Sequence, residues 1–164
     1  MLRKLALGAI VAAVTLMAAS PASAQISGTS VSGAGWNDAR ELITVSAHST
    51  PTGVRGHASS RVLDESGNLL RWVSGPVTCL YQVSSTSVVV AIRITHSAGY
   101  DDRLPPANAG FVFYLEDNGK PGEDDAPDII GTGFVASPLT DCSNTGQGGA
   151  TPFIRGDIRI TNSV

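Results

Sequence analysis

The chain has 164 residues and a formal net charge of −3, and 15% of its residues are charged. Because acidic residues outnumber basic ones, a nucleic-acid partner has no electrostatic support, and anionic membrane surfaces are disfavoured for the same reason. The length fits one domain with a sizeable hydrophobic core. Beyond residue 24, no segment is long and apolar enough to span a membrane.

The first 24 residues have the pattern of a cleaved secretory signal. A basic pair at 3–4 precedes an apolar run over 5–19, and small residues that suit a signal peptidase occupy 22–24. The run is too short to serve as a membrane anchor. Cleavage would remove two positive charges and leave 140 residues (164 − 24) with a formal charge of −5 (−3 − 2). We therefore expect a secreted, extracellular protein, with a signal peptide over 1–24 and a single antiparallel β domain over 25–164.

Two cysteines, Cys79 and Cys142, are present in the exported part of the chain. An even count in an oxidising compartment favours pairing them, although two buried free thiols are an alternative. A metal site is a weaker alternative, because two isolated cysteines without clustered histidines do not make four ligands. The disulfide would close a loop of 63 residues (142 − 79), to which the chain-entropy model assigns about 4 kcal/mol of stabilisation.

After residue 24, apolar residues recur at every second position, which is typical of β-strands. We expect a weak first strand over 28–34. The next two strands each show one apolar face, with Ile43, Val45 and Ala47 in the first and Val54, Ala58 and Val62 in the second. A turn over 65–68 leads into a strand over 69–73, which Gly75-Pro76 should break or bulge. Pairing then resumes with one side made of Val77, Cys79, Tyr81 and Val83.

The second half of the chain shows the same alternation. Its clearest strand has an apolar and a polar face, with Val88, Val90, Ile92 and Ile94 opposite Arg93 and Thr95. A polar loop over 97–108 precedes a strand that starts with Phe111, Phe113 and Leu115, and this strand should form a hairpin with 129–135. After a loop over 137–151, the last strand alternates Ile154, Ile158 and Ile160 with Arg155, Asp157 and Arg159. We expect the core to contain Val88, Val90, Ile92, Ile94, Phe111, Phe113 and Ile158.

About eight short strands at regular spacing predict an all-β protein. Sequential hairpins favour an antiparallel meander that forms a closed or flattened barrel, because closure hides the strand edges that a secreted single domain would otherwise expose. A β-sandwich is the alternative, since periodicity does not separate the two architectures.

Several segments carry a resemblance to known proteins, namely GHAS at 56–59, GPVTCLYQVS at 75–84, GFVFYLEDNGKPGEDDAPDII at 110–130, a DC pair at 141–142 and PFIRGDIRI at 152–160. Through them the chain resembles a group of small secreted actinobacterial β proteins with no assigned activity. It is more distantly similar to the "post-COAP" β modules of bacterial surface proteins. Such proteins often turn with Gly-Asn where this chain has Ser84-Ser85. The resemblance implies a β fold and an export route, and it supplies no catalytic residues.

An acidic loop is the segment with the most chemical content. Over 116–128 six carboxylates face Lys120 alone, a net charge of −5, and they belong to Glu116, Asp117, Glu123, Asp124, Asp125 and Asp128. Calcium accepts about six to eight oxygen ligands, so one hypothesis is a calcium site made of Asp117, Asn118, Glu123, Asp124, Asp125 and Asp128. The spacing does not match an EF-hand loop. We favour a solvated hairpin loop without a cation, lying at the surface between two paired strands, and expect no cofactor besides this calcium.

The third strand carries a polar face made of Arg55, His57, Ser59 and Arg61. If this face turned inward in a barrel, a polar cavity for a small anionic ligand would be lined by Arg55, His57, Arg61 and Trp72. The outward orientation is favoured, because the apolar residues of the same strand need the core face. Trp36 and Trp72 would suit an exposed platform that stacks on sugars, but we favour burial in the core for both.

Catalysis is not expected from this sequence. His48, His57 and His96 supply raw material for hydrolysis, but no Gly-x-Ser-x-Gly nucleophile elbow is present. The acidic residues cluster in one loop, whereas glycoside cleavage needs them across a cleft. We expect His48 and His57 to be solvated and His96 to cap a sheet edge. The sequence thus predicts a secreted, non-catalytic β domain that binds a partner or serves as a structural component of the cell envelope. A small-ligand-binding barrel is the alternative, and a hydrolase is the third choice.

Overall fold

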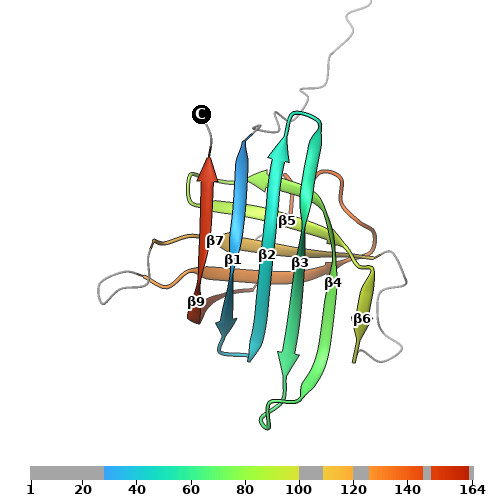
Figure 1. Cartoon of the computed structure of the whole chain (residues 1–164), viewed down its shortest axis with the longest axis vertical. Helices are drawn as coiled ribbons and strands as arrows, with labels where there is room; N and C mark the ends of the chain where they lie inside the picture. The colour runs from blue at the N-terminus through green and yellow to red at the C-terminus, as the bar shows by residue number, and fades with distance from the viewer. Residues whose placement is uncertain (1–27, 100–108, 120–125, 146–148, 163–164) are drawn as a thin grey trace, which may run out of the picture.

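The computed structural model describes residues 28–99, 109–119, 126–145 and 149–162, so the predicted signal at 1–24 lies outside the described residues. The described ranges form nine β-strands and no helix (Figure 1). In chain order the strands are β1 (Thr29–Asn37), β2 (Glu41–Thr50), β3 (Gly53–Leu63), β4 (Leu69–Gln82), β5 (Ser87–Arg93), β6 (His96–Ala98), β7 (Gly110–Glu116), β8 (Ile129–Val135) and β9 (Ala150–Asn162). Within these ranges, no helix is long and apolar enough to cross a membrane.

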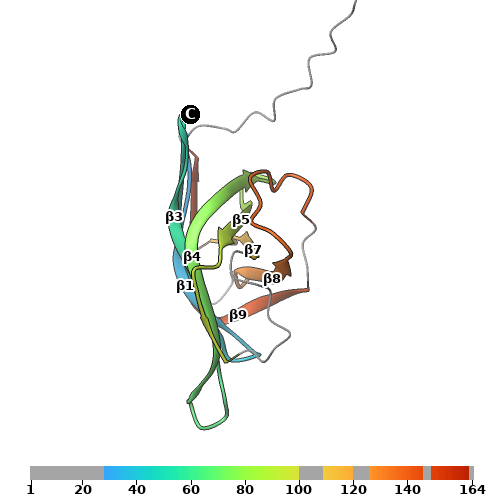
Figure 2. The ribbon, with the colours of Figure 1, turned by 90° about the vertical axis from the view of Figure 1, so that its right-hand side faces the viewer.

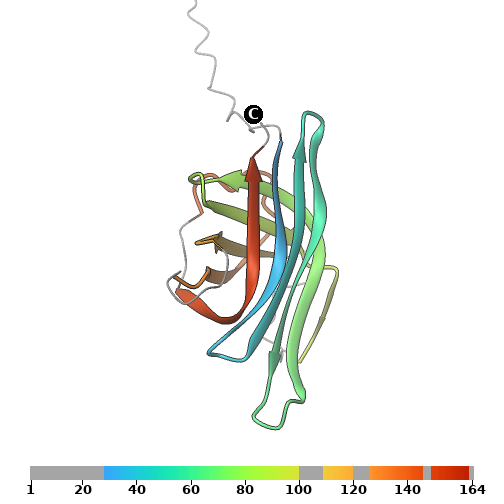
Figure 3. The ribbon, with the colours of Figure 1, turned by 60° about the vertical axis from the view of Figure 1, so that its left-hand side comes forward.

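The strands form two facing layers that share two strands (Figure 2). Sheet A contains, in order, β6, the first part of β4, β3, β2, β1 and the later part of β9. Sheet B contains the second part of β4, then β5, β7, β8 and the start of β9. In Figure 1, sheet A lies in front and the strands of sheet B run across it behind. β4 and β9 connect the layers because each bends from one sheet into the other (Figure 3).

Every hydrogen-bonded pair of the described strands is antiparallel. Consecutive strands pair with each other and close into a ring, in the order β1, β2, β3, β4, β5, β7, β8, β9 and back to β1. β6 adds to sheet A beside β4. This arrangement confirms the predicted all-β antiparallel meander. The ring is flattened into two layers. This arrangement fits both the predicted flattened barrel and the alternative of a β-sandwich.

A tight corner lies where β4 leaves β3 and turns toward β5. A Cβ at Gly75 would lie 1.7 Å from the carbonyl oxygen of Arg93, so only glycine lets the two backbones approach this closely. The strand continues through Pro76, and the predicted irregularity lies further on, as a register shift between Val77 and Cys79.

This register shift overturns one prediction. Val77 packs in the interior, whereas Cys79 and Tyr81 lie on the outer side of sheet B, and Val83 is 47% exposed. The expectation that these four side chains share one side is therefore wrong. The physical reason is that one extra residue in a strand moves every later side chain to the other face.

The interior between the sheets is one apolar cluster. All seven predicted core residues belong to it and are at most 9% exposed, namely Val88, Val90, Ile92, Ile94, Phe111, Phe113 and Ile158. Sheet A contributes the inward side chains of Val31, Ile43, Val45, Ala47, Ala58 and Val73. The predicted core is thus confirmed.

A second apolar cluster lies on the outer side of sheet B. Its buried members are Cys79, Val89, Ala91, Val112, Tyr114 and Cys142, and Leu139 packs against them. The segment over 136–145 lies over this side (Figure 2) and is attached by the disulfide between Cys79 and Cys142, whose Cα atoms are 6.1 Å apart. The predicted disulfide is confirmed. Because of this cover, Val89 and Ala91 are buried as well, so β5 is buried on both faces.

The last strand departs from the predicted pattern at its start. It begins at Ala150, inside the predicted loop, and its register against β1 is irregular near the end of β1. Phe153 points inward over Gly35, where a Cβ would lie 2.5 Å from the Phe153 ring, and Ile154 is 69% exposed. The prediction that Ile154 shares the core face with Ile158 is therefore wrong, because the bulge reverses the alternation.

Two strand boundaries also differ from the predictions. β1 extends to Asn37, three residues beyond the predicted end at 34. β6 lies at the start of the predicted loop over 97–108, and residues 100–108 of that loop are outside the described ranges.

Candidate functional site

The outer side of sheet A, called the open face below, carries the candidate site. Alternation along the strands sends every second side chain to this side, and the antiparallel register determines which of them are neighbours. One row across the sheet, from β9 to β4, consists of Arg155, Trp36, Leu42, Arg61 and Trp72. We call this the aromatic row. Both of its tryptophans are half-buried, and both of its arginines are exposed.

A neighbouring row, called the hydroxyl row, carries smaller polar side chains. It consists of Asp157, Ala34, Thr44, Ser59 and Ser74, with His96 of β6 at its end. Thr44 Oγ1 and Ser59 Oγ share a hydrogen bond of 2.7 Å between β2 and β3. The imidazole of His96 stacks on Trp72, with ring centroids 6.3 Å apart and an angle of 10° between the planes. The two rows therefore place aromatic, cationic and hydroxyl groups on one continuous surface.

The open face is basic, although the chain as a whole is acidic. Its arginines are Arg55, Arg61, Arg155 and Arg159, and Asp157 is the acidic residue in the same rows. Asp157 Oδ2 accepts a hydrogen bond of 2.9 Å from Arg159 Nε, so these two charges compensate each other. The other three arginines form no ion pair with a described residue. Considering the described part of the chain, the open face thus presents positive charge without an ion-pair partner to solvent.

The prediction that both tryptophans are buried in the core is wrong. Trp36 and Trp72 lie on the open face, and neither belongs to the apolar clusters of the described residues. The sequence did contain a signal for this placement. Trp36 shares its side of β1 with Ser30, Ser32 and Ala34, and Trp72 shares its side of β4 with Ser74. Small and polar partners at every second position are typical of a solvent-facing side.

The predicted polar face of β3 points outward, as favoured from the sequence. Arg55, His57 and Arg61 are exposed, and Ser59 is 6% exposed among larger neighbours on the same side. The opposite side of β3 contributes Ala58 to the apolar interior. Among the described residues, Arg55, His57, Arg61 and Trp72 therefore line no interior cavity, and a role for them in ligand binding stays a prediction.

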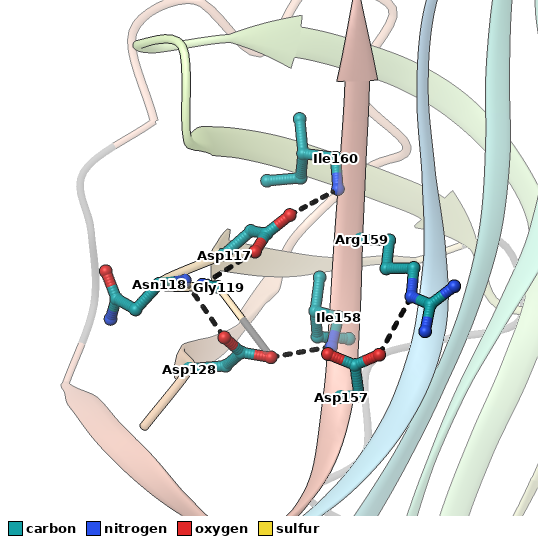
Figure 4. Close-up of polar contacts among 8 residues, drawn as sticks. All are labelled: Asp117, Asn118, Gly119, Asp128, Asp157, Ile158, Arg159 and Ile160. Carbon is teal, nitrogen blue, oxygen red and sulfur yellow. Dashed lines mark hydrogen bonds and ion pairs between the residues drawn. The ribbon is translucent and has the colours of Figure 1, made fainter. Parts of the chain in front are cut away.

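Two carboxylates of the acidic loop hold the backbone of β9 (Figure 4). Asp117 Oδ2 accepts a hydrogen bond from Ile160 N at 2.8 Å, and Asp128 Oδ2 accepts one from Ile158 N at 2.6 Å. Their other oxygens accept hydrogen bonds from backbone N–H groups of the loop itself, at 3.0 and 2.9 Å. Over this stretch β9 pairs with β1 on one side. The two aspartates therefore bind its N–H groups on the other side, where a neighbouring strand would otherwise do so.

Asp128 departs from the expectation of a fully solvated loop, because it is only 5% exposed. Burial disfavours its ionised form and raises the pKa of Asp128 above its ordinary value. The backbone hydrogen bonds from Asn118 and Ile158 oppose this shift, and the nearby charges of Asp117 and Asp157 add to it. The surrounding hairpin is as predicted, since Glu116 of β7 pairs with Ile129 of β8.

The calcium hypothesis stays a prediction. Each carboxylate oxygen of Asp117 and Asp128 accepts a backbone hydrogen bond, and Asn118 Nδ2 donates to the carbonyl oxygen of Pro127 at 2.8 Å. The remaining residues of the hypothesis lie outside the described ranges, namely Glu123, Asp124 and Asp125. Across the ranges that are described, no three His, Cys, Asp or Glu side chains are grouped as a metal ion would need.

The histidines lie apart from any hydrolytic arrangement in the described part of the chain. His48 and His57 are exposed on the open face, as expected. His96 lies in β6, beside β4, and its Nδ1 atom is 3.0 Å from Thr95 Oγ1. None of the three forms a hydrogen bond with a described Ser or Asp side chain. The described contacts of the histidines therefore include no Ser or Asp partner, and the contact of His96 with Thr95 joins two adjacent, exposed residues.

Comparisons with protein-family models, with curated proteins and with solved structures give no match for this chain. The resemblance to small secreted actinobacterial β proteins, and to post-COAP modules, therefore stays a prediction from the sequence. Inferences about function depend on the chemistry of the open face.

Proposed function

We propose that the protein is a secreted, non-catalytic binding domain whose open face binds a carbohydrate chain. The observation that carries this proposal is the aromatic row, in which Trp36 and Trp72 lie half-buried on the same side of sheet A, each next to an exposed arginine. An indole ring offers a planar apolar face and a polar edge, and the apolar face of a sugar ring stacks on such a surface. Guanidinium and hydroxyl groups beside it supply hydrogen bonds for the hydroxyls of the sugar.

The geometry favours an extended ligand over a compact one. Trp36 belongs to β1 and Trp72 to β4, so β2 and β3 lie between them. Three strand spacings correspond to about 14 Å, which a chain of several sugar rings can bridge. The hydroxyl row runs parallel to this path and offers the partly exposed Thr44 as a partner.

The proposal is preferred over the alternatives for physical reasons. A small-ligand barrel needs an interior cavity, whereas the described interior consists of packed apolar side chains such as Ile92 and Phe113. A hydrolase needs a nucleophile, a base and a group that orients the base, whereas the described histidines contact no Ser or Asp side chain and His96 contacts the hydroxyl of its sequence neighbour Thr95. The secretory pattern at 1–24 and the disulfide fit a partner outside the cytoplasm. Polysaccharides of a cell envelope are such partners, which would make the domain an envelope-associated component.

The test is a binding assay with the exported chain, residues 25–164, on cellulose, chitin, peptidoglycan and soluble polysaccharides. We expect the domain to bind at least one of these polysaccharides. Trp36→Ala and Trp72→Ala should each weaken the affinity for it about tenfold or more. Phe134→Ala is the matched control, because Phe134 is a 43% exposed aromatic residue in β8, away from sheet A. Melting curves would check that each variant is folded. Absence of binding to every polysaccharide, or wild-type affinity in both tryptophan variants, would overturn the proposal.

A further inference from the structure

The aromatic row leads into a pocket at the β9 side of the open face. The pocket has a volume of about 440 Å³, and Trp36 and Arg155 of the row form part of its lining. Leu63 and Ile154 add apolar surface, and the turns after β1 and β3 add polar groups. Ile154 is the residue that the bulge in β9 leaves 69% exposed. A ligand lying along the aromatic row would therefore meet this pocket next to Trp36.

Hydrogen bonds within the protein hold the walls of the pocket in place. In the turn after β1, Glu41 N donates to Asn37 Oδ1 at 3.0 Å, and Asn37 Nδ2 donates to Glu41 Oε2 at 3.1 Å. Leu63 N donates to the carbonyl oxygen of Arg40 at 3.1 Å, which joins this turn to the end of β3. Arg40 has a φ of 56°, in the left-handed region that non-glycine residues rarely adopt. The pocket is thus preformed, which lowers the entropic cost of binding.

The turn after β3 forms the second wall. Asp64 Oδ1 accepts hydrogen bonds of 2.8 Å from Ser66 N and from Asn68 N, and Asp64 Oδ2 accepts one of 3.0 Å from Asn68 Nδ2. The side-chain hydrogen bond from Asn68 is the main reason why the pKa of Asp64 lies below its ordinary value. The carboxylate of Asp64 is therefore engaged by its own turn.

The lining of the pocket carries two cations, Arg40 and Arg155, and two anions, Asp64 and Glu65. Glu65 Oε1 lies 3.9 Å from Arg40 Nη2, so these two residues compensate each other at the rim. Asp64 is held by the three hydrogen bonds of its turn. Arg155 is exposed and forms no ion pair with a described residue. The pocket therefore combines an indole face, aliphatic surface and the guanidinium of Arg155, which forms no ion pair with a described residue.

We propose that this pocket is a subsite for a sugar ring that carries a carboxylate, and that the ligand of the open face is an acidic polysaccharide. The ring packs against Trp36 and Ile154, and its carboxylate accepts paired hydrogen bonds from the planar guanidinium of Arg155. Glu65 accepts hydrogen bonds from ring hydroxyls. Arg55 and Arg61 of the open face, which form no ion pair with a described residue, favour further acidic rings along the same chain. This inference rests on the proposed function, since it names the class of carbohydrate bound.

The test compares a uronic-acid polymer with the same polymer after complete methyl esterification, which removes the charge and keeps the rings. Polygalacturonate and polyglucuronate serve as probes, in calorimetric titrations of the exported chain at physiological ionic strength. We expect the acid forms to bind about tenfold or more tightly than their esters. Arg155→Gln should abolish most of this preference, and Arg155→Lys should retain part of it, because lysine keeps the charge and loses the paired geometry.

Arg93→Gln is the matched control, since it removes the same charge from an exposed arginine of β5, which belongs to sheet B and not to the open face. We expect it to keep the preference for the acid form. Equal affinity for acid and ester, equal losses in Arg155→Gln and Arg93→Gln, or a preference for a glycerol-phosphate polymer would overturn this inference. Each of these results leaves the carbohydrate-binding proposal in place. Failure to bind any polysaccharide, neutral or acidic, would overturn both.

Discussion

The two layers of this protein share one interior and differ on their outer sides. The outer side of sheet B carries apolar residues, among them Val89, Val112 and Tyr114, and lies under the segment that the disulfide attaches. The outer side of sheet A carries small polar residues such as Thr44 and Ser59, together with two half-exposed tryptophans. One layer is buried on both faces, and the other is open on one.

The difference separates the surfaces that contribute to stability from the surface to which we assign the proposed binding. Covering sheet B removes a second apolar surface from water, which adds to the free energy of unfolding. Sheet A buries its apolar side chains mainly in the shared interior, so its outer side chains are available for the proposed binding. Changes on the covered side should therefore affect folding, and changes on the open face should affect binding.

The largest expected effect comes from detaching the cover. We expect Cys79→Ala combined with Cys142→Ala to lower the free energy of unfolding by about 4 kcal/mol, because the bond closes a 63-residue loop in the unfolded chain. Denaturant melts measure this loss. Increased binding of a hydrophobic dye would report exposure of the outer side of sheet B. A variant with unchanged stability and no dye binding would show that the cover stays in place without its disulfide.

Neighbouring residues of β5 test the shared interior. Ile92 is fully buried between the layers, whereas Arg93 is exposed. We expect Ile92→Ala to cost about 3 kcal/mol and Arg93→Ala well under about 1 kcal/mol. Denaturant melts would measure the free energy of unfolding of the two variants. Equal losses would mean that the inward and outward faces of β5 have been wrongly assigned.

The tryptophans give the direct contrast between the two outer sides. Tyr114→Ala removes a 5% exposed ring from the covered side and should cost about 3 kcal/mol. Trp72→Ala removes a larger, half-buried ring from the open face and should cost about 1–2 kcal/mol, including the loss of its stacking on His96. Thermal melts would compare the two. A greater loss for Trp72→Ala would indicate that the open face contributes to stability as the covered side does.

The smallest expected effect on stability comes from the edge of β9, and it depends on pH. Asp128→Asn leaves one acceptor oxygen for two backbone N–H groups, so we expect a loss of about 1 kcal/mol at neutral pH. Because the folded-state pKa of Asp128 is raised, its ionised form disfavours folding relative to its protonated form. The stability difference between wild type and Asp128→Asn should be greatest below pH 3.8, fall as pH rises through the raised pKa, and then stay constant. Urea melts across this range would measure it, and a difference that grows with rising pH would contradict the assignment.

Local patterns in the sequence were sufficient for the β class, the antiparallel order, the alternating core of β5 and β7, and the disulfide. Alternation over a few residues decides which side of a strand is apolar, and two cysteines in an oxidising compartment have one pairing. The outward polar face of β3 could be predicted for the same reason, because its apolar residues need the core.

Other features depend on contacts between distant parts of the chain. The bulges that redirect Cys79 and Ile154 arise where a strand changes partner, and no local pattern marks the residue at which the register shifts. The burial of Asp128 follows from an unpaired edge of β9, which exists only once both sheets are assembled.

The candidate site also depends on contacts between distant parts of the chain. Trp36 and Trp72 are 36 residues apart (72 − 36), and neither is informative alone. Antiparallel register across β1, β2, β3 and β4 places them in one row, and the β9 bulge adds Ile154 and Arg155 at its end. The sequence determined which residues alternate, and the tertiary structure determined which residues are neighbours, because neighbours in a sheet are set by strand pairing and not by distance along the chain.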